Sequence, residues 1–406
     1  MTKKFNETKI PAGGSNRVAL VKDFLAQHYD IKINIFDHTK VMIEPKTMEY
    51  NHEISIRDIG LHMVEEGVLG CGSILKDILT SPNHTTPYNP IKEYFQALEG
   101  NYAGTSHIDL LCSFLKARDY GDKEEEGYYQ KRLVYTLRKW LVASVACVMG
   151  IKANDATFMI VNVDGGIGKS SLLEYLVPDM LKSYYSRSVK DMNYPDMFTT
   201  NFLIQFDEMV GITRSTAEEY KNILSSMHIN VSKRFTTTKQ RYASACGTSN
   251  RDAEHGGFLT PEMSLRRFAV NHIDFIDWEA YIKVVDIDQL WAEAVMLLGQ
   301  NFDYSWNKAD FKEFEEYNSR FLVQTSSYRV VKENYRVPEE GEDELAEFKQ
   351  PVEILRDLRA ARKINASMFT ITDVNIGIAM NQLGFVRRGK KMAGTSRYGY
   401  DVIPLF

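Results

Sequence analysis

The apolar residues in the first third of the chain follow mostly helical spacing. They recur three and four residues apart from Ile56 onward, and residues 128–148 form a longer run with apolar side chains on most faces. Before them, residues 31–36 and 40–44 alternate between apolar and polar side chains, which predicts a short β-hairpin. We therefore expect residues 1–150 to form a mainly helical domain.

The pattern changes after residue 150, where short apolar runs bounded by turn residues alternate with helical stretches. The runs span residues 158–163, 202–208, 242–247 and 266–273. Strands that alternate with helices in this way are typical of a sheet covered by helices on both faces. The sequence therefore predicts an α/β core within residues 151–337.

The last part of the chain predicts a small separate unit. Residues 338–349 are acidic and poor in apolar side chains, which favours a linker. Two helical segments, residues 352–362 and 372–383, then precede two strand-like segments within residues 385–403. Two helices followed by a hairpin predict a winged-helix-like domain over residues 350–406.

The composition is that of a globular protein. The chain has 406 residues, of which 44% are hydrophobic and 25% charged, and its net charge is −5. This charge excludes a wholly basic coat for nucleic acid but allows a local basic groove. Its four cysteines lie far apart, which disfavours zinc sites and disulfides and favours a cytoplasmic location. The longest apolar run, residues 140–151, is too short to span a bilayer, so we expect no membrane association.

The strongest chemical signal is NVDGGIGKSS, residues 162–171, between a strand pattern and a helical one. Glycines in such a loop let backbone N–H groups approach phosphate oxygens, while the lysine reaches the β- and γ-phosphates and the next hydroxyl holds Mg²⁺. Val163 replaces the first glycine of the usual pattern, and a plain glycine-rich helix start is the alternative. We expect phosphates to bind at Asp164, Gly165, Gly166, Ile167, Gly168, Lys169, Ser170 and Ser171, with Lys169 also catalytic and Ser170 a Mg²⁺ ligand.

Two adjacent carboxylates follow the second apolar run. A parallel sheet would deliver Asp207 and Glu208 to the same edge as the phosphate loop. Asp207 is then expected to order Mg²⁺, and Glu208 to orient or deprotonate the attacking water. The alternative is that the two carboxylates merely begin a loop.

Three further polar residues extend this constellation. The third apolar run leads into CGTSN, which ends at Asn250, where an amide reaches the γ-phosphate or the water, although Thr-Ser-Asn is also ordinary turn chemistry. Arg266 and Arg267 stand at the start of the fourth run, and an arginine offered to the γ-phosphate of a neighbouring subunit would stabilise the transition state. The sequence does not say which of the two acts, and a plain surface pair is the alternative.

Two segments are rich in cations without nearby acids. The first is predicted to be a hairpin at residues 232–242, and the second forms the turn region of the terminal unit. Both suit contacts with the phosphate backbone of DNA, and solvated surfaces are the alternative for both. The DNA-binding candidates are Lys233, Arg234, Lys239 and Arg241 in the first segment and Arg387, Arg388, Lys390 and Lys391 in the second.

In their order along the chain, these motifs resemble the virulence-associated E family of phage and mobile-element proteins, AAA+ ATPases related to superfamily 3 helicases. The resemblance covers roughly residues 55–300 and includes NPIKEYFQALEG, residues 89–100. It implies a P-loop AAA+ core, ATP and Mg²⁺ as cofactors, a homo-oligomer expected to be a hexamer, and single-stranded or forked DNA as partner. By resemblance, Lys169 and Ser170 look like the Walker A pair, Asp207 and Glu208 the Walker B pair, Asn250 sensor 1, and Arg266 or Arg267 the arginine finger.

The sequence thus predicts an ATP-hydrolysing DNA helicase or translocase that acts in replication of a phage or mobile genetic element. A DNA-binding replication initiator, regulated by ATP and without unwinding activity, is the alternative, because little in the sequence separates a motor from a switch. A third hypothesis is a P-loop kinase that phosphorylates a small molecule. The arginine pair and the basic hairpin argue against the kinase.

Overall fold

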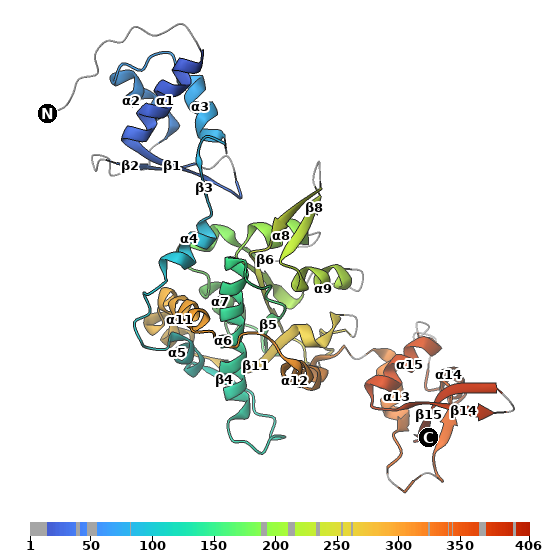
Figure 1. The fold of residues 1–406 in the computed structure, drawn as a ribbon. Helices are drawn as coiled ribbons and strands as arrows, with labels where there is room; N and C mark the ends of the chain where they lie inside the picture. The colour runs from blue at the N-terminus through green and yellow to red at the C-terminus, as the bar shows by residue number, and fades with distance from the viewer. Residues whose placement is uncertain are drawn as a thin grey trace.

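The computed structural model describes residues 14–37, 41–46, 55–81, 83–187, 193–209, 216–232, 236–252, 255–260, 263–323, 325–339, 341–342, 344–364, 371–392 and 395–406. Figure 1 shows a small N-terminal lobe, a large central lobe and a C-terminal lobe that follow one another along the chain. Among the described residues, no helix is long and apolar enough to cross a membrane.

The N-terminal lobe packs three helices against a three-stranded sheet. Its elements are α1 (Gly14–His28), β1 (Tyr29–Asn34), β2 (Val41–Pro45), α2 (Ile56–Glu65), α3 (Gly72–Thr80) and β3 (Thr86–Tyr88). β1 and β2 pair in antiparallel fashion, which confirms the predicted hairpin, and β3 adds to β1 in parallel. The helices meet in a core that includes Phe24, Ile59 and Leu75. This lobe is therefore a mixed α/β unit with its own core.

The central lobe is built on a six-stranded sheet in the order β4-β11-β5-β10-β7-β6. Its strands are β4 (Leu115–Ala117), β5 (Thr157–Val161), β6 (Tyr185–Arg187), β7 (Leu203–Phe206), β10 (Ser244–Ser249) and β11 (Phe268–Ile276). Neighbouring strands run parallel except at the edge, where β4 is antiparallel to β11. Every residue of β5, β7 and β10 is buried, as expected of a parallel sheet with both faces covered. The predicted α/β core is confirmed.

Helices and short 3₁₀ turns surround this sheet. They are α4 (Pro90–Ala97), α5 (His107–Ser113), α6 (Tyr128–Met149), α7 (Lys169–Tyr175), η1 (Asp179–Tyr184), α8 (Tyr194–Thr200), η2 (Asp207–Met209), α9 (Ala217–Ser225), η4 (Leu265–Arg267), α10 (Trp278–Val284), α11 (Ile287–Gly299), α12 (Lys308–Asn318) and η5 (Ser319–Phe321). A two-stranded hairpin, β8 (His228–Ser232) and β9 (Thr236–Gln240), projects beside α8 and α9 (Figure 1).

Helix α6 is the longest of these helices and is mostly buried, as its sequence predicts. Its Trp140 is fully buried and donates a hydrogen bond from Nε1 to the carbonyl of Ala245 in β10, at 3.1 Å. Residues of α4, α5 and α6 share one hydrophobic cluster with Phe158 of β5. The packing therefore departs from the domain boundary expected at residue 150, because these helices bury their apolar faces against the sheet.

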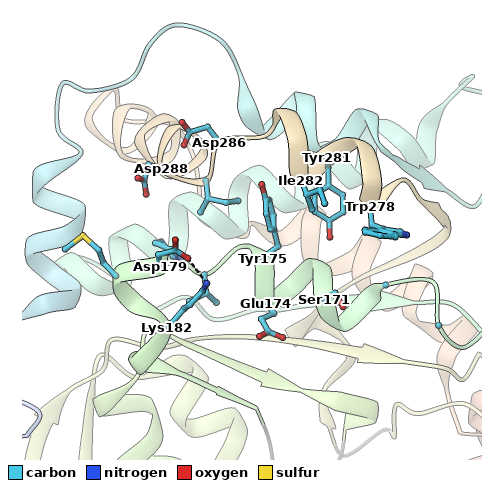
Figure 2. A pocket seen from close by; sticks show the side chains of 16 residues that line it. Ser171, Glu174, Tyr175, Asp179, Lys182, Trp278, Tyr281, Ile282, Asp286 and Asp288 are labelled. Atoms are coloured by element: carbon cyan, nitrogen blue, oxygen red, sulfur yellow. Dashed lines mark ion pairs between the residues drawn. The ribbon is translucent and has the colours of Figure 1, made fainter.

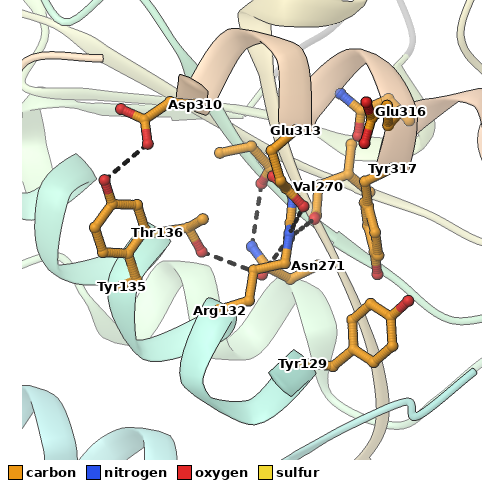
Figure 3. Close-up of polar contacts among 12 residues, drawn as sticks. Tyr129, Arg132, Tyr135, Thr136, Val270, Asn271, Asp310, Glu313, Glu316 and Tyr317 are labelled. Carbon is orange, nitrogen blue, oxygen red and sulfur yellow. Dashed lines mark hydrogen bonds and ion pairs between the residues drawn. The ribbon is translucent and has the colours of Figure 1, made fainter. Parts of the chain in front are cut away.

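A buried polar network fastens α6 to β11 and α12 (Figure 3). Arg132 donates from Nη1 to Asn271 Oδ1 at 3.0 Å and from Nε to Glu313 Oε1 at 2.6 Å. Thr136 donates to the same Asn271 oxygen at 3.1 Å, and the Arg132 guanidinium lies 3.9 Å from the ring centroid of Tyr317. A buried charge is tolerated only when its donors are satisfied, so these bonds fix β11 beside β5, the strand that precedes the glycine-rich loop.

The C-terminal lobe has a core of its own. It contains α13 (Ser326–Asn334), β12 (Tyr335–Arg336), β13 (Glu347–Lys349), α14 (Pro351–Ala360), α15 (Asp373–Gln382), β14 (Arg387–Met392) and β15 (Thr395–Pro404). The two predicted helices and the β14–β15 hairpin are present, and the winged-helix assignment stays a prediction. Two features differ from expectation. Helix α13 joins this core through Val330 and Val331, and the end of the expected linker forms β13, which pairs with β15.

Candidate active site

The glycine-rich loop lies where the sequence predicts it, between the end of β5 and the start of α7. Gly166 and Gly168 have φ angles of 81° and 92°, in the left-handed region that glycine adopts without strain. Asn162 accepts a hydrogen bond from the Asp164 N–H at 2.6 Å and donates to the Ile273 carbonyl at 2.7 Å. These bonds tie the entry of the loop to β11. The space above Gly165, Gly166 and Gly168 is open, because a Cβ on any of them would meet no atom within 4 Å.

Lys169 is the first residue of α7 and is 7% exposed. Its Nζ donates to the carbonyl oxygens of Asn162 and Asp164, both at 3.0 Å. Burial lowers the pKa of Lys169, against the opposing effects of the Glu208 and Asp164 carboxylates. Two carbonyl groups of the preceding loop thus hold the ammonium group at the start of α7.

Asp207 follows β7 and receives hydrogen bonds from side chains of several neighbouring elements. Ser170 Oγ donates to its Oδ1 at 3.0 Å, Gln205 Nε2 at 2.7 Å, and Arg187 Nε donates to its Oδ2 at 2.9 Å. Burial alone would raise the pKa of Asp207, but the bonds from Gln205, Arg187 and Ser170 outweigh it and lower the pKa. The structure therefore joins the loop hydroxyl to the carboxylate two strands away.

Hydroxyl and carboxylate oxygens are the ligands that Mg²⁺ prefers, and Ser170 and Asp207 supply one of each. The described residues contain no group of three or more His, Cys, Asp or Glu side chains placed to hold a metal ion. Mg²⁺ commonly takes only one or two protein carboxylates and fills its other positions with water and substrate phosphates. The donor set at Ser170 and Asp207 fits that pattern.

Glu208 stands in an unusual backbone conformation, with φ 51° and ψ 22°. This left-handed region of φ and ψ is strained for residues other than glycine, and a residue stays in it where the surrounding structure imposes it. The Glu208 carboxylate accepts a hydrogen bond from the Asn250 N–H at 3.1 Å, so the ends of β7 and β10 meet here. The Asn250 side chain is exposed. Glu208 and Asn250, which are both predicted to contact the attacking water, are therefore neighbours.

Arg266 and Arg267 lie in η4, just before β11, and not within a strand as expected. Arg267 is bound to its own lobe, through Asp155 at 3.0 Å and the Ser225 hydroxyl at 2.7 Å. Arg266 is exposed and its guanidinium lies 5.7 Å from the centroid of the Phe311 ring. The structure thus separates the pair, and Arg266 is the arginine that faces outward.

The basic hairpin is present, but its cations differ in placement. Lys239 on β9 is exposed, whereas Lys233 and Arg234 lie outside the described residues. Arg241 is fully buried and donates hydrogen bonds to the carbonyl oxygens of Ala243, Ile223, Leu224 and Asn154, at 2.7 to 3.0 Å. The expectation that Arg241 contacts DNA is wrong for this arrangement, because its guanidinium has no access to solvent.

The predicted cations of the terminal unit lie on β14. Arg387, Arg388, Lys390 and Lys391 are all exposed. Arg388 forms an ion pair with Asp401 at 3.4 Å, and the Arg387 guanidinium lies 5.5 Å from the centroid of the Tyr398 ring. These side chains leave a cationic strand at the surface. Contact between this strand and DNA stays a prediction.

The sequence motifs did not indicate that Arg187, Gln205 or Thr248 belongs to this site. Arg187 reaches Asp207 from the adjacent edge strand β6, and Thr248 Oγ1 donates to Asp207 from β10 at 3.4 Å. Gln205 lies in β7 two positions before Asp207, and this closeness in sequence was the one signal available. Arg187 and Thr248 become neighbours of the site only through strand pairing.

Comparisons with known proteins agree with part of this picture. A model of the virulence-associated protein E-like domain matches residues 102–323. No curated protein matches the chain. Two solved apo structures of the NrS-1 C-terminal region, both A form, have 11% identity to this chain, and each alignment covers 96% of this chain and 99% of the other. Their TM-scores are 0.42 and 0.40.

Proposed function

The chain belongs to the virulence-associated protein E-like family, and from this premise we propose that it is an ATP-hydrolysing DNA helicase or translocase of a replicating phage or mobile element. The observation that carries the proposal is the 3.0 Å hydrogen bond between Ser170 in the loop and Asp207 after β7. It supports a single site in which a phosphate-binding loop and a metal-ordering carboxylate cooperate.

In this proposal, the triphosphate lies along the open side of the loop. Backbone N–H groups around Gly166 and Gly168 bind its oxygens, and Lys169 exchanges its two carbonyl partners for the β- and γ-phosphates. Ser170 and Asp207 would hold Mg²⁺, whose chemistry when bound is to neutralise phosphate charge. Arg187 then gives up part of its contact with Asp207.

Glu208 acts as the base or orienting group for the attacking water. Its strained backbone and its bond to the Asn250 N–H aim the carboxylate toward the junction of β7 and β10. Asn250 directly follows β10 and completes the contact with water or γ-phosphate. The pair of adjacent carboxylates, Asp207 and Glu208, favours hydrolysis over transfer to a small acceptor.

Arg266 serves as the arginine finger of a neighbouring subunit. Its exposure and the anchoring of Arg267 to Asp155 support this choice between the two. A cation offered from outside the subunit stabilises charge that develops on the transferred phosphoryl group. Hydrolysis would then require an oligomer, for which a hexamer is the expected form.

DNA is the proposed partner, held through the phosphate backbone. Lys239 on β9 and the exposed cations of β14 support two contact surfaces on different lobes. The strongly basic strand β14 also favours the second candidate function, an initiator that binds DNA under ATP control without separating strands. Both candidates share the nucleotide site and differ in whether hydrolysis moves DNA.

A forked-duplex unwinding assay decides between them. The wild type and Lys169→Ala are compared with ATP and Mg²⁺, and Lys312→Ala, which changes an exposed lysine on α12, is the matched control. We expect strand separation by the wild type and the control and none by Lys169→Ala. Binding to the fork without strand separation by the wild type would support the initiator and contradict the motor.

A further inference from the structure

A cavity of about 860 Å³ opens directly beside the glycine-rich loop (Figure 2). Gly166, Gly168 and Ser171 line one part of it, and α10 with the start of α11 forms the opposite wall. This volume lies within the range of small-molecule sites in proteins. The cavity is continuous with the loop, so a ligand whose phosphates lie on the loop can extend into it.

The middle of the cavity is aromatic and rigid. Tyr175 and Tyr281 pack with ring centroids 4.9 Å apart, and the Tyr175 hydroxyl donates to the Val285 carbonyl at 2.7 Å. Trp278 lines the same wall and is 53% exposed. The other three tryptophans of the chain, Trp140, Trp291 and Trp306, are at most 6% exposed. A half-exposed indole at a cavity wall offers a flat face on which another ring can stack.

The end of the cavity away from Ser171 is acidic. Figure 2 shows Ser171 and Trp278 toward one end and Asp179, Asp286 and Asp288 toward the other. Asp179 is paired with Lys182 at 2.6 Å, and Asp288 accepts from the Tyr94 hydroxyl at 2.6 Å. Carboxylates accept hydrogen bonds and repel phosphate, so this end suits a group that carries N–H donors.

The cavity therefore presents, in order, a phosphate-binding loop, an aromatic wall and hydrogen-bond acceptors. We propose that it binds the base and ribose of the nucleotide, with the base against Trp278, and that it selects an amino-bearing base over uracil. The inference rests on the proposed function only in that the loop must bind a triphosphate. It adds the part of the ligand that the loop itself does not recognise.

Calorimetric titration of the full chain with ATP, UTP and inorganic tripolyphosphate, each with Mg²⁺, tests the proposal. Tripolyphosphate carries the phosphates without base or ribose. In the variant Trp278→Ala we expect affinity for ATP to fall roughly tenfold, the loss typical of one base–aromatic stack, while tripolyphosphate affinity stays within about twofold. Trp278→Phe should keep most of the ATP affinity, and the wild type should bind ATP more tightly than UTP.

Two further variants keep the result interpretable. Ile282→Trp fills the cavity from α10 and should weaken ATP but not tripolyphosphate. Phe275→Ala, an equally exposed aromatic residue on β11 that does not line the cavity, should change neither. Equal losses for ATP and tripolyphosphate in Trp278→Ala, or no loss for ATP, would overturn the inference. If the wild type bound no triphosphate, or Lys169→Ala bound ATP normally, the proposed function would fail instead.

Discussion

At the scale of single residues, the site depends on two adjacent carboxylates with different tasks. Asp207 is held by Ser170, Gln205 and Arg187, which makes it a fixed anchor. Glu208 has one backbone donor, the Asn250 N–H, and a strained main chain. One carboxylate therefore suits metal positioning and the other suits action on water.

The variant Glu208→Gln separates these tasks. It keeps the size and the acceptor oxygen of the side chain but cannot take a proton, so we expect ATP binding within about twofold of wild type and turnover reduced roughly 10²- to 10⁴-fold. Calorimetry measures binding, and phosphate release measures turnover. Glu218→Gln, an exposed acid on α9, is the control. Normal turnover in Glu208→Gln would exclude Glu208 as the base.

His272 makes stability depend on pH. It is buried in β11, where its Nδ1 lies 2.8 Å from the Tyr120 hydroxyl, and burial, with Arg118 nearby, lowers the pKa of His272 from 6.5 to about 4. The unfolded chain therefore takes up this proton first as pH falls. The native state loses stability between pH 6.5 and about 4 and regains it as pH rises.

We expect this one group to account for a loss of about 2.5 kcal/mol in the free energy of unfolding between pH 7 and pH 4.5. His272→Gln keeps a partner for Tyr120 but does not titrate, so its stability should fall less over that interval. Urea denaturation of both proteins at the two pH values measures the difference. Equal losses in the two proteins would show that His272 does not titrate as proposed.

The contiguous part of the site was predictable from sequence and the rest was not. The loop chemistry of residues 162–171 lies within one short segment, so its pattern survives without knowledge of the fold. Arg187 meets Asp207 because β6 pairs with β7, and Thr248 does so because β10 lies between β5 and β7. Strand order is a property of the whole sheet, and the sequence motifs alone do not contain it.

At the scale of elements, the β8–β9 hairpin shows that positive charge in a sequence does not by itself identify a side chain that contacts DNA. Lys239 and Arg241 are two residues apart, yet one is exposed on β9 and the other is buried beneath α9. An arginine that donates hydrogen bonds to several main-chain carbonyls holds the surrounding segments together. A count of cations cannot distinguish this role from DNA contact, because both use the same donors.

Substitution of Arg241 and substitution of Lys239 should therefore have different effects. Arg241→Ala removes the side-chain donor from the buried carbonyl groups of Leu224 and Asn154, so we expect the free energy of unfolding to fall by about 3 kcal/mol or more. Lys239→Ala should leave stability within about 0.5 kcal/mol and weaken binding of single-stranded DNA. Chemical denaturation and fluorescence anisotropy at low salt measure the two effects. A fully stable Arg241→Ala with weakened DNA binding would reverse our assignment.

At the scale of the whole molecule, hydrophobic packing sets the limits of the lobes better than the periodicity of the chain does. Helices α4 to α6 have clear helical periodicity, and only their contacts with Phe158 and its neighbours assign them to the central sheet. Helix α13 belongs to the C-terminal core for the same reason. Helical periodicity indicates which face is buried and does not say against what.

The proposed oligomer makes Arg266 essential in a testable way. Arg266→Ala alone should bind ATP but hydrolyse it poorly, since no subunit receives a finger, with a loss of roughly 10³-fold or more. Lys169→Ala subunits have an intact Arg266 but an inactive loop. Mixing the two variants should restore part of the turnover, because a Lys169→Ala subunit donates its arginine to an Arg266→Ala site. No recovery in mixed oligomers would contradict action across subunits.

The most direct test of the central claim is steady-state ATP hydrolysis by the wild type and Lys169→Ala, each with and without single-stranded DNA at low salt. We predict wild-type turnover that rises with DNA and disappears in the variant, because Lys169 holds the phosphates through which hydrolysis occurs. Turnover by Lys169→Ala equal to that of the wild type would contradict the assignment of the site, whatever the effect of DNA.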